Sequence, residues 1–233
     1  TGRTLEEAVF NLYHTVDRRM FWGHLSYVIL SKEAVIKGAV KDVADLIDRF
    51  RETRYRTYFF VTQDPIDKVM LVEPLDNIPL AFSKLSDPID NYNHTSLIEP
   101  MDLKDLIIHT DEPGHQVLLP VLKVTKQWSH KSGKHTDLLM EEVAVIHNNT
   151  LLDIIPENIF QGARGVEPDF VRDLVVLSPD DKKRYLSVVV YNKRVKIKPV
   201  FENGKLRFHI KMKIKGTLQM AKFNMKKSEI EKE

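Results

Sequence analysis

The residues of this chain that could do chemistry are spread thinly, and the first to weigh are its nine histidines. Two pairs lie close together in the sequence, His109 with His115 and His130 with His135. A metal site needs three or four ligands at short, characteristic spacings. Neither pair has a carboxylate or a third histidine placed in that way, so we interpret these histidines as surface loop residues and predict no metal site.

Nucleophilic and phosphate-binding motifs are also missing from the sequence. No G-x-S-x-G elbow occurs, and the absence of cysteine excludes thiol nucleophiles, thiolate zinc sites and disulfides. The run Gly162-Ala163-Arg164-Gly165 is too short for a P-loop and follows a predicted helix rather than a strand. The sequence therefore predicts neither an enzyme nor a bound cofactor.

The strongest chemical feature is positive charge concentrated near the end of the chain. Residues 182–227 contain fifteen Lys or Arg against the single acid Glu202, whereas residues 1–181 contain nineteen basic and twenty-nine acidic residues. The net charge of +2 hides this asymmetry. Opposite signs in the two parts indicate an interaction surface at the basic end, or contact between the two parts.

The basic stretch predicts a long antiparallel hairpin. Apolar and basic residues alternate on both sides of Asn203-Gly204, and a period of two is typical of strands with one buried face. Asn-Gly is the strongest short signal for a two-residue hairpin turn. The apolar face is expected to contain Val195, Ile197, Leu206, Phe208, Ile210, Met212 and Ile214. The other face is a candidate docking face made of Arg194, Lys196, Lys198, Lys205, Arg207, Lys211, Lys213 and Lys215.

Several partners fit such a cationic face. Nucleic acid, anionic lipid headgroups or an acidic protein surface could bind it. It could also be a solvated face, since lysine-rich strands resist edge-to-edge pairing. Phe208 alternates onto the apolar face, which makes nucleic acid less favoured because single-strand binders stack bases on exposed aromatics. The apolar face in turn needs a cover, either Phe223 and Ile230 or a neighbouring molecule.

Upstream, the pattern of elements indicates a mixed α/β architecture. A helix opens at Thr4, and strands cover residues 25–30 and 57–62. Between them lies a helix that Ser31 can cap, that is broken or loosened at Gly38 and that continues to Phe50, which implies parallel strands joined by a right-handed crossover. Residues 87–100 are rich in Pro and Asp and form the predicted loop and domain boundary. A helix opening at Asp102 follows, and then strands over 117–126, 138–146 and 150–155, the last two forming a hairpin.

The sequence therefore predicts two to three small domains, each a mixed sheet with helices packed on it. Residues 1–98 form a first α/β domain without its first strands, and residues 99–180 form a second mixed α/β domain. Residues 181–233 begin a third domain with the basic hairpin. Because the chain opens directly at a helix start, we expect it to be part of a longer protein. No apolar run is long enough to span a membrane.

Four stretches, in this order, resemble the C subunits of spore nutrient germinant receptors, the Ger(x)C or GerAC-type lipoproteins. Each stretch is short, and their order and spacing carry the resemblance over most of the chain. They are residues 1–8 with 18–30, residues 43–56 with Pro74 to Pro79, residues 118–122 with 142–146 and 162–165, and the hairpin segments 196–199 and 202–205.

The resemblance implies a non-enzymatic, lipid-anchored receptor subunit that is required for nutrient-triggered germination. Family members work beside the A and B membrane subunits at the spore inner membrane and carry a lipid, such as palmitate, on an N-terminal cysteine that this chain lacks. The resemblance thus implies membrane subunits as partners, with an anionic membrane surface as a further possibility, and neither nucleic acid nor an assigned small-molecule substrate. A nucleic-acid-binding module that uses the basic hairpin is the alternative function.

Overall fold

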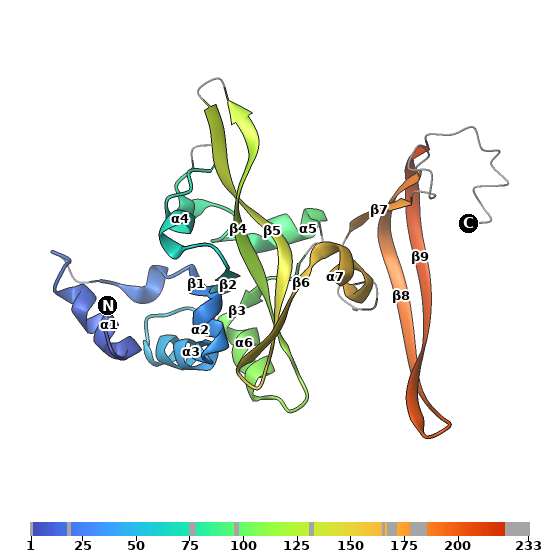
Figure 1. Cartoon of the computed structure of the whole chain (residues 1–233), viewed down its shortest axis with the longest axis horizontal. Helices are drawn as coiled ribbons and strands as arrows, with labels where there is room; N and C mark the ends of the chain where they lie inside the picture. The colour runs from blue at the N-terminus through green and yellow to red at the C-terminus, as the bar shows by residue number, and fades with distance from the viewer. Residues whose placement is uncertain are drawn as a thin grey trace. The chain divides into compact units, whose positions relative to one another are not determined.

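The structure of the chain, a computed structural model (Figure 1), describes residues 2–17, 20–74, 78–95, 98–130, 133–164, 166, 172–177 and 186–221. It divides into two units. The first comprises Thr1–Asp90 and Ile98–Phe160, and the second comprises Asn91–Leu97 and Gln161–Glu233.

The first unit is built on a six-stranded mixed sheet of order β1-β2-β4-β5-β6, with β3 paired to β2. β1, β2 and β4 run parallel, whereas β4, β5 and β6 form an antiparallel meander. The crossover from β1 to β2 passes through two helices, as parallel pairing requires. The strand bounds are β1 Tyr27–Ser31, β2 Tyr58–Thr62, β3 Met101–Asp102, β4 Val117–His130, β5 Gly133–His147 and β6 Thr150–Pro156.

The helices begin where the sequence places capping side chains. Thr4, Ser31 and Asp102 each accept a hydrogen bond from the backbone N–H three residues later, as predicted. The sequence predicts a single helix that is broken or loosened at Gly38. In the structure Gly38, at a φ of 76°, separates this stretch into two helices, α2 and α3. The helical bounds are α1 Leu5–Tyr13, η1 Trp22–His24, α2 Lys32–Ile36, α3 Ala39–Arg49, α4 Ile66–Met70, η2 Leu80–Phe82, α5 Pro88–Thr95, α6 Leu103–Asp111 and α7 Glu157–Arg164.

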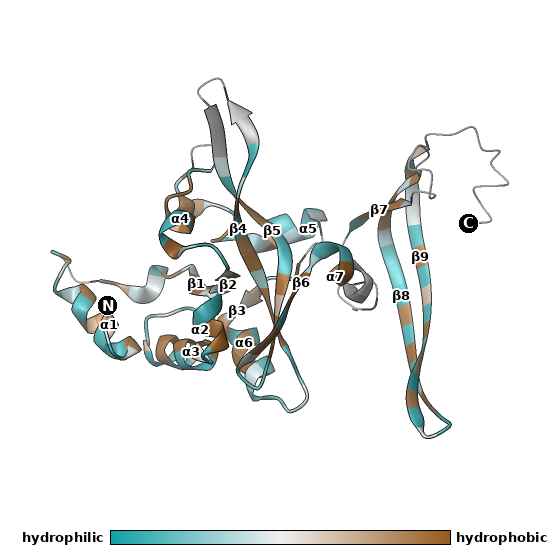
Figure 2. Cartoon of the chain, in the orientation of Figure 1, coloured by the Kyte–Doolittle hydropathy of each residue, from teal (hydrophilic) through white to brown (hydrophobic). Residues whose placement is uncertain are grey.

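Strand β2 carries the core of the first unit, since all five of its residues are buried. Successive side chains of a strand point to opposite faces of the sheet. Phe59 and Val61 accordingly pack into one cluster with residues of α3 and α6. Phe60 packs into a second cluster with Val69 of α4. The sheet is therefore covered on both faces, and hydrophobic colouring is concentrated along its strands (Figure 2).

The second unit contains a three-stranded antiparallel sheet of order β7-β8-β9. Its strands are β7 Asp173–Leu177, β8 Leu186–Glu202 and β9 Lys205–Ala221. β7 pairs with residues 186–190 of β8 only, so the rest of β8 pairs with β9 alone among the described residues. The predicted mixed class, with a long final antiparallel hairpin, is confirmed.

Two local predictions are wrong. Residues 87–100 are not a continuous loop, because they contain helix α5. Pro88 opens that helix, where its fixed φ and missing N–H suit the first helical position. The dipeptide Asp64-Pro65 predicts that Asp64 caps α4, but the Asp64 carboxylate instead accepts a hydrogen bond from the Val124 N–H at 2.8 Å.

The division into domains at residues 98 and 180 stays a prediction. The parallel pairing of β2 with β4 joins strands from either side of residue 98 in one sheet. Residues 178–185, around the second boundary, lie outside the described part of the chain. Among the described residues, none of the helices combines the length and the apolar character that crossing a bilayer demands.

We predict that Phe59→Ala lowers the free energy of unfolding by about 3–5 kcal/mol, because it removes a fully buried ring from the centre of the sheet. Urea denaturation followed by circular dichroism measures the loss. Phe82→Ala is the matched control, since Phe82 is 74% exposed and its truncation should cost less than about 0.5 kcal/mol. Equal losses in the two variants would contradict the assignment of β2 as the core strand.

Candidate functional site

The β8–β9 hairpin is closed by a tight turn that its sequence selects. Asn203 and Gly204 both adopt left-handed conformations, with φ of 52° and 74°. Two such residues make the type I′ turn, whose twist matches that of the flanking strands. Pairing continues without interruption from Glu202 opposite Lys205 to Asn192 opposite Lys215. The turn therefore fixes the register along this whole stretch.

This register places all eight predicted docking residues on one face of the hairpin. Residues directly opposite each other in antiparallel strands share a face, and the same face recurs every second residue. Arg194 lies opposite Lys213, and Lys196 lies opposite Lys211. We call this surface the cationic face, and it consists of Arg194, Lys196, Lys198, Lys205, Arg207, Lys211, Lys213 and Lys215, together with Asn192, Val200, Glu202 and His209.

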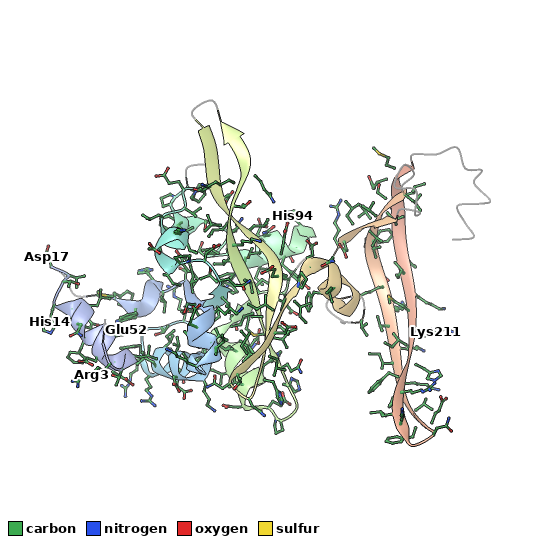
Figure 3. All side chains as sticks on the ribbon, viewed as in Figure 1. Arg3, His14, Asp17, Glu52, His94 and Lys211 are labelled. Atoms are coloured by element: carbon green, nitrogen blue, oxygen red, sulfur yellow. The ribbon has the colours of Figure 1, made fainter. Side chains whose placement is uncertain are left out.

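The cationic face is exposed and weakly neutralised. Eight cations against the single carboxylate of Glu202 leave a formal charge of +7 with His209 neutral. That carboxylate lies 3.5 Å from the Arg207 guanidinium and 3.7 Å from the His209 ring. The other seven cations form no ion pair with a described residue, and Lys211 projects away from the ribbon (Figure 3). Their docking role stays a prediction, but their shared face supports it.

The opposite face of the hairpin is apolar and equally uncovered among the described residues. Val195 lies opposite Met212, and Ile197 lies opposite Ile210. The register also adds Pro199 and Phe201, the latter 75% exposed. The two faces appear as alternating bands along β8 and β9 in Figure 2. Phe223 and Ile230, which the sequence offers as a cover, lie outside the described residues.

A second candidate site in the first unit was missed by the sequence reasoning. His109, in the last turn of α6, and His115 lie with their ring centroids 5.4 Å apart. The turn through Pro113-Gly114 reverses the chain and brings them together, and this turn was the signal available in the sequence. His109 is therefore not a loop residue, and its buried Nδ1 has no hydrogen-bond partner among the described residues.

These histidines line a pocket of about 300 Å³ with charges of both signs nearby. Glu112 lies 3.6 Å from His115, and Asp111 accepts a hydrogen bond from Lys41 at 2.8 Å, which raises the pKa of the Lys41 ammonium. Asn149 seals one side by binding the backbone of Gly38 and Lys41. No group of three side chains able to hold a metal occurs among the described residues.

The region of Gly162 that could resemble a phosphate loop is helical. α7 runs through Gly162 to Arg164, so the backbone N–H groups there lie within a helix rather than around an open loop. Gly165 lies outside the described residues. The interpretation of this run as the end of a helix is therefore favoured over a phosphate site.

Comparison with known protein families gives two matches that follow one another along the chain. Residues 1–124 match the family described as the spore germination protein N-terminal domain. Residues 141–233 match the family described as spore germination B3/GerAC like, C-terminal. The second match includes the whole β8–β9 hairpin.

Comparison with individual proteins also finds spore germination proteins. The chain is 22% identical to spore germination protein KC of Bacillus subtilis (strain 168) over 234 residues, which cover 95% of this chain and 57% of that protein. The crystal structure of the GerBC protein is similar with a TM-score of 0.61 and 18% identity, over 93% of this chain and 60% of that one. This likeness shows a shared fold, and the chain spans about three fifths of the length of each relative.

The like-charge pairs of the cationic face generate a prediction about stability. Lys211→Glu should place a carboxylate opposite Lys196 and raise the stability of the hairpin by up to about 1 kcal/mol, because like charges directly opposite each other are destabilising. Hydrogen exchange of the β8 and β9 amides measures this change. Lys211→Gln removes the repulsion without adding attraction, so its protection should be intermediate. Faster exchange in Lys211→Glu would show that the lysine stabilises the hairpin.

Proposed function

We propose that this chain, which belongs to the GerAC family of spore germination proteins, acts as the C subunit of a nutrient germinant receptor. In this proposal it is a non-enzymatic protein that is held at the spore inner membrane by a lipid and works beside the A and B membrane subunits. The lipid is attached to a cysteine that this chain does not contain.

The observation that carries the proposal is the pair of consecutive family matches. The N-terminal model covers residues 1–124 and the C-terminal model covers residues 141–233, so together they span both structural units in the family's own order. The fold shared with the GerBC protein supports the same assignment. A chance likeness of one α/β layer would not extend into the separate β7-β8-β9 sheet.

The surfaces of the second unit support a role in protein or membrane interaction. The β8–β9 hairpin offers an apolar face with Phe201, Phe208 and Ile210 at least half exposed, and a cationic face opposite. Exposed apolar area of this extent is typical of surfaces that a partner or a further part of the polypeptide covers. A subunit that assembles with other proteins uses such faces directly.

The proposal predicts that the protein co-purifies with two membrane subunits of a germinant receptor. A tagged form, produced in sporulating cells and extracted from spore membranes with mild detergent, should retain both subunits, and spores without the protein should fail to germinate on nutrients until the gene is restored. Identification of the retained proteins by mass spectrometry and loss of spore refractility measure the two results.

Two outcomes of this experiment would contradict the proposal. One is purification of the protein without any membrane subunit from spores that respond normally to nutrients. The other is normal nutrient-triggered germination of spores that lack the protein. Recovery of DNA or RNA in place of membrane subunits would favour the nucleic-acid-binding alternative, for which the cationic face is the supporting observation.

A further inference from the structure

We infer that the cationic face of the β8–β9 hairpin binds anionic lipid headgroups and so orients the protein on the membrane. This inference rests on the proposed function, because the lipid anchor would hold the protein at a bilayer. It goes beyond that function by assigning a second, electrostatic contact with the membrane to particular residues.

The first observation is the form of the charge array. Cations occupy most of the alternate positions along β8 and β9, about 7 Å from the next such position within a strand, and Arg194 with Lys213 and Lys196 with Lys211 lie directly opposite each other, about 5 Å apart. Both spacings are shorter than the Debye length of about 8 Å at physiological salt. The eight cations therefore act together on an extended anionic surface rather than as separate charges.

The second observation is that ion pairs with described residues restrain few of the cations. Arg207 has an ion pair with Glu202, and the other seven cations have none with a described residue. Recognition of a defined carboxylate or phosphate on a folded partner uses guanidinium groups held in place for bidentate contact. Exposed, unconstrained lysines suit a surface whose charges move to meet them, as headgroups in a fluid bilayer do. Six of the eight cations are lysines.

The third observation separates lipid from nucleic acid. The two phenylalanines of the paired hairpin, Phe201 and Phe208, lie on the apolar face, so the ring of His209, 3.7 Å from the Glu202 carboxylate, is all that the cationic face offers for base stacking. With His209 neutral, its uncharged members are Asn192, Val200 and His209. A surface made almost only of cations attracts anionic lipid, and the free energy of binding becomes more favourable with each Lys or Arg near the bilayer.

The fourth observation is that the like-charge pairs of the cationic face do not stabilise the hairpin. Arg194 faces Lys213 and Lys196 faces Lys211, and such pairs oppose the hairpin rather than stabilise it. A partner with dense negative charge relieves this repulsion. A headgroup layer does so along the whole face, because no set of acids has to be matched to each cation.

The test uses a variant that removes charge from the face without weakening the fold. Lys211→Glu, Lys213→Glu and Lys215→Glu, combined, change the formal charge of the face from +7 to +1. The first two carboxylates would lie opposite Lys196 and Arg194, so the hairpin should remain paired. The matched control reverses three exposed cations of the first unit, Lys37→Glu, Arg51→Glu and Lys68→Glu, with the same change in net charge.

The measurement is co-sedimentation of the purified protein with vesicles of phosphatidylcholine, with or without phosphatidylglycerol, at physiological salt. The wild-type protein and the control variant should bind only the anionic vesicles. The triple variant on the face should bind them about 100-fold more weakly, as expected for the loss of three cations near the surface. Duplex DNA added as a competitor should not displace the protein from the vesicles when the concentration of DNA is lower than that of the vesicle lipid.

Equal binding of the triple variant and the wild-type protein would overturn the inference, as would binding that is indifferent to phosphatidylglycerol or displacement by DNA. Co-purification with the membrane subunits is measured in parallel on the same variant. If the wild-type protein ignores vesicles while the triple variant loses the subunits, the face binds an acidic protein, and the inference fails while the proposed function stands. Vesicle binding without any co-purifying subunit would support the inference and contradict the proposed function.

Discussion

The alternation of side chains along a strand is the constraint on which the architecture of this protein depends. Because neighbouring residues must point to opposite faces, a strand can serve two different environments at once. In β2 both environments are apolar, so Phe59 and Phe60 enter separate clusters and helices cover both faces of the sheet. In β8 and β9 the two environments differ, and the same rule produces one apolar and one cationic face.

The hairpin keeps its charge at a cost to its own stability. Each like-charge pair across the strands is unfavourable by a few tenths to about 1 kcal/mol. Pairing is maintained instead by the Asn203-Gly204 turn and by apolar pairs such as Ile197 with Ile210. A sequence selected for the hairpin alone would place opposite charges across from each other. The repeated cations therefore indicate a requirement outside the hairpin, which an anionic surface would meet.

Much of the fold follows from local sequence signals. The hairpin, its turn and its register could be predicted because alternation and Asn-Gly determine them within a short segment, and Thr4, Ser31 and Asp102 mark helix starts for the same reason. Helix α5 was missed because the prolines around it read as loop signals, although Pro88 suits a first helical turn. The hydrogen bond from Val124 to Asp64 and the meeting of His109 with His115 depend on tertiary structure, which local patterns do not reveal.

The measurement that tests the central claim most directly compares two neighbouring residues on opposite faces of β8. The chain has no cysteine, so Lys196→Cys and Ile197→Cys each accept a single nitroxide label. Accessibility to a water-soluble paramagnetic reagent is measured with and without anionic vesicles. The account predicts that vesicles shield the label at position 196 and leave the label at position 197 unchanged. Shielding at position 197 alone, or no change at either position, would contradict it.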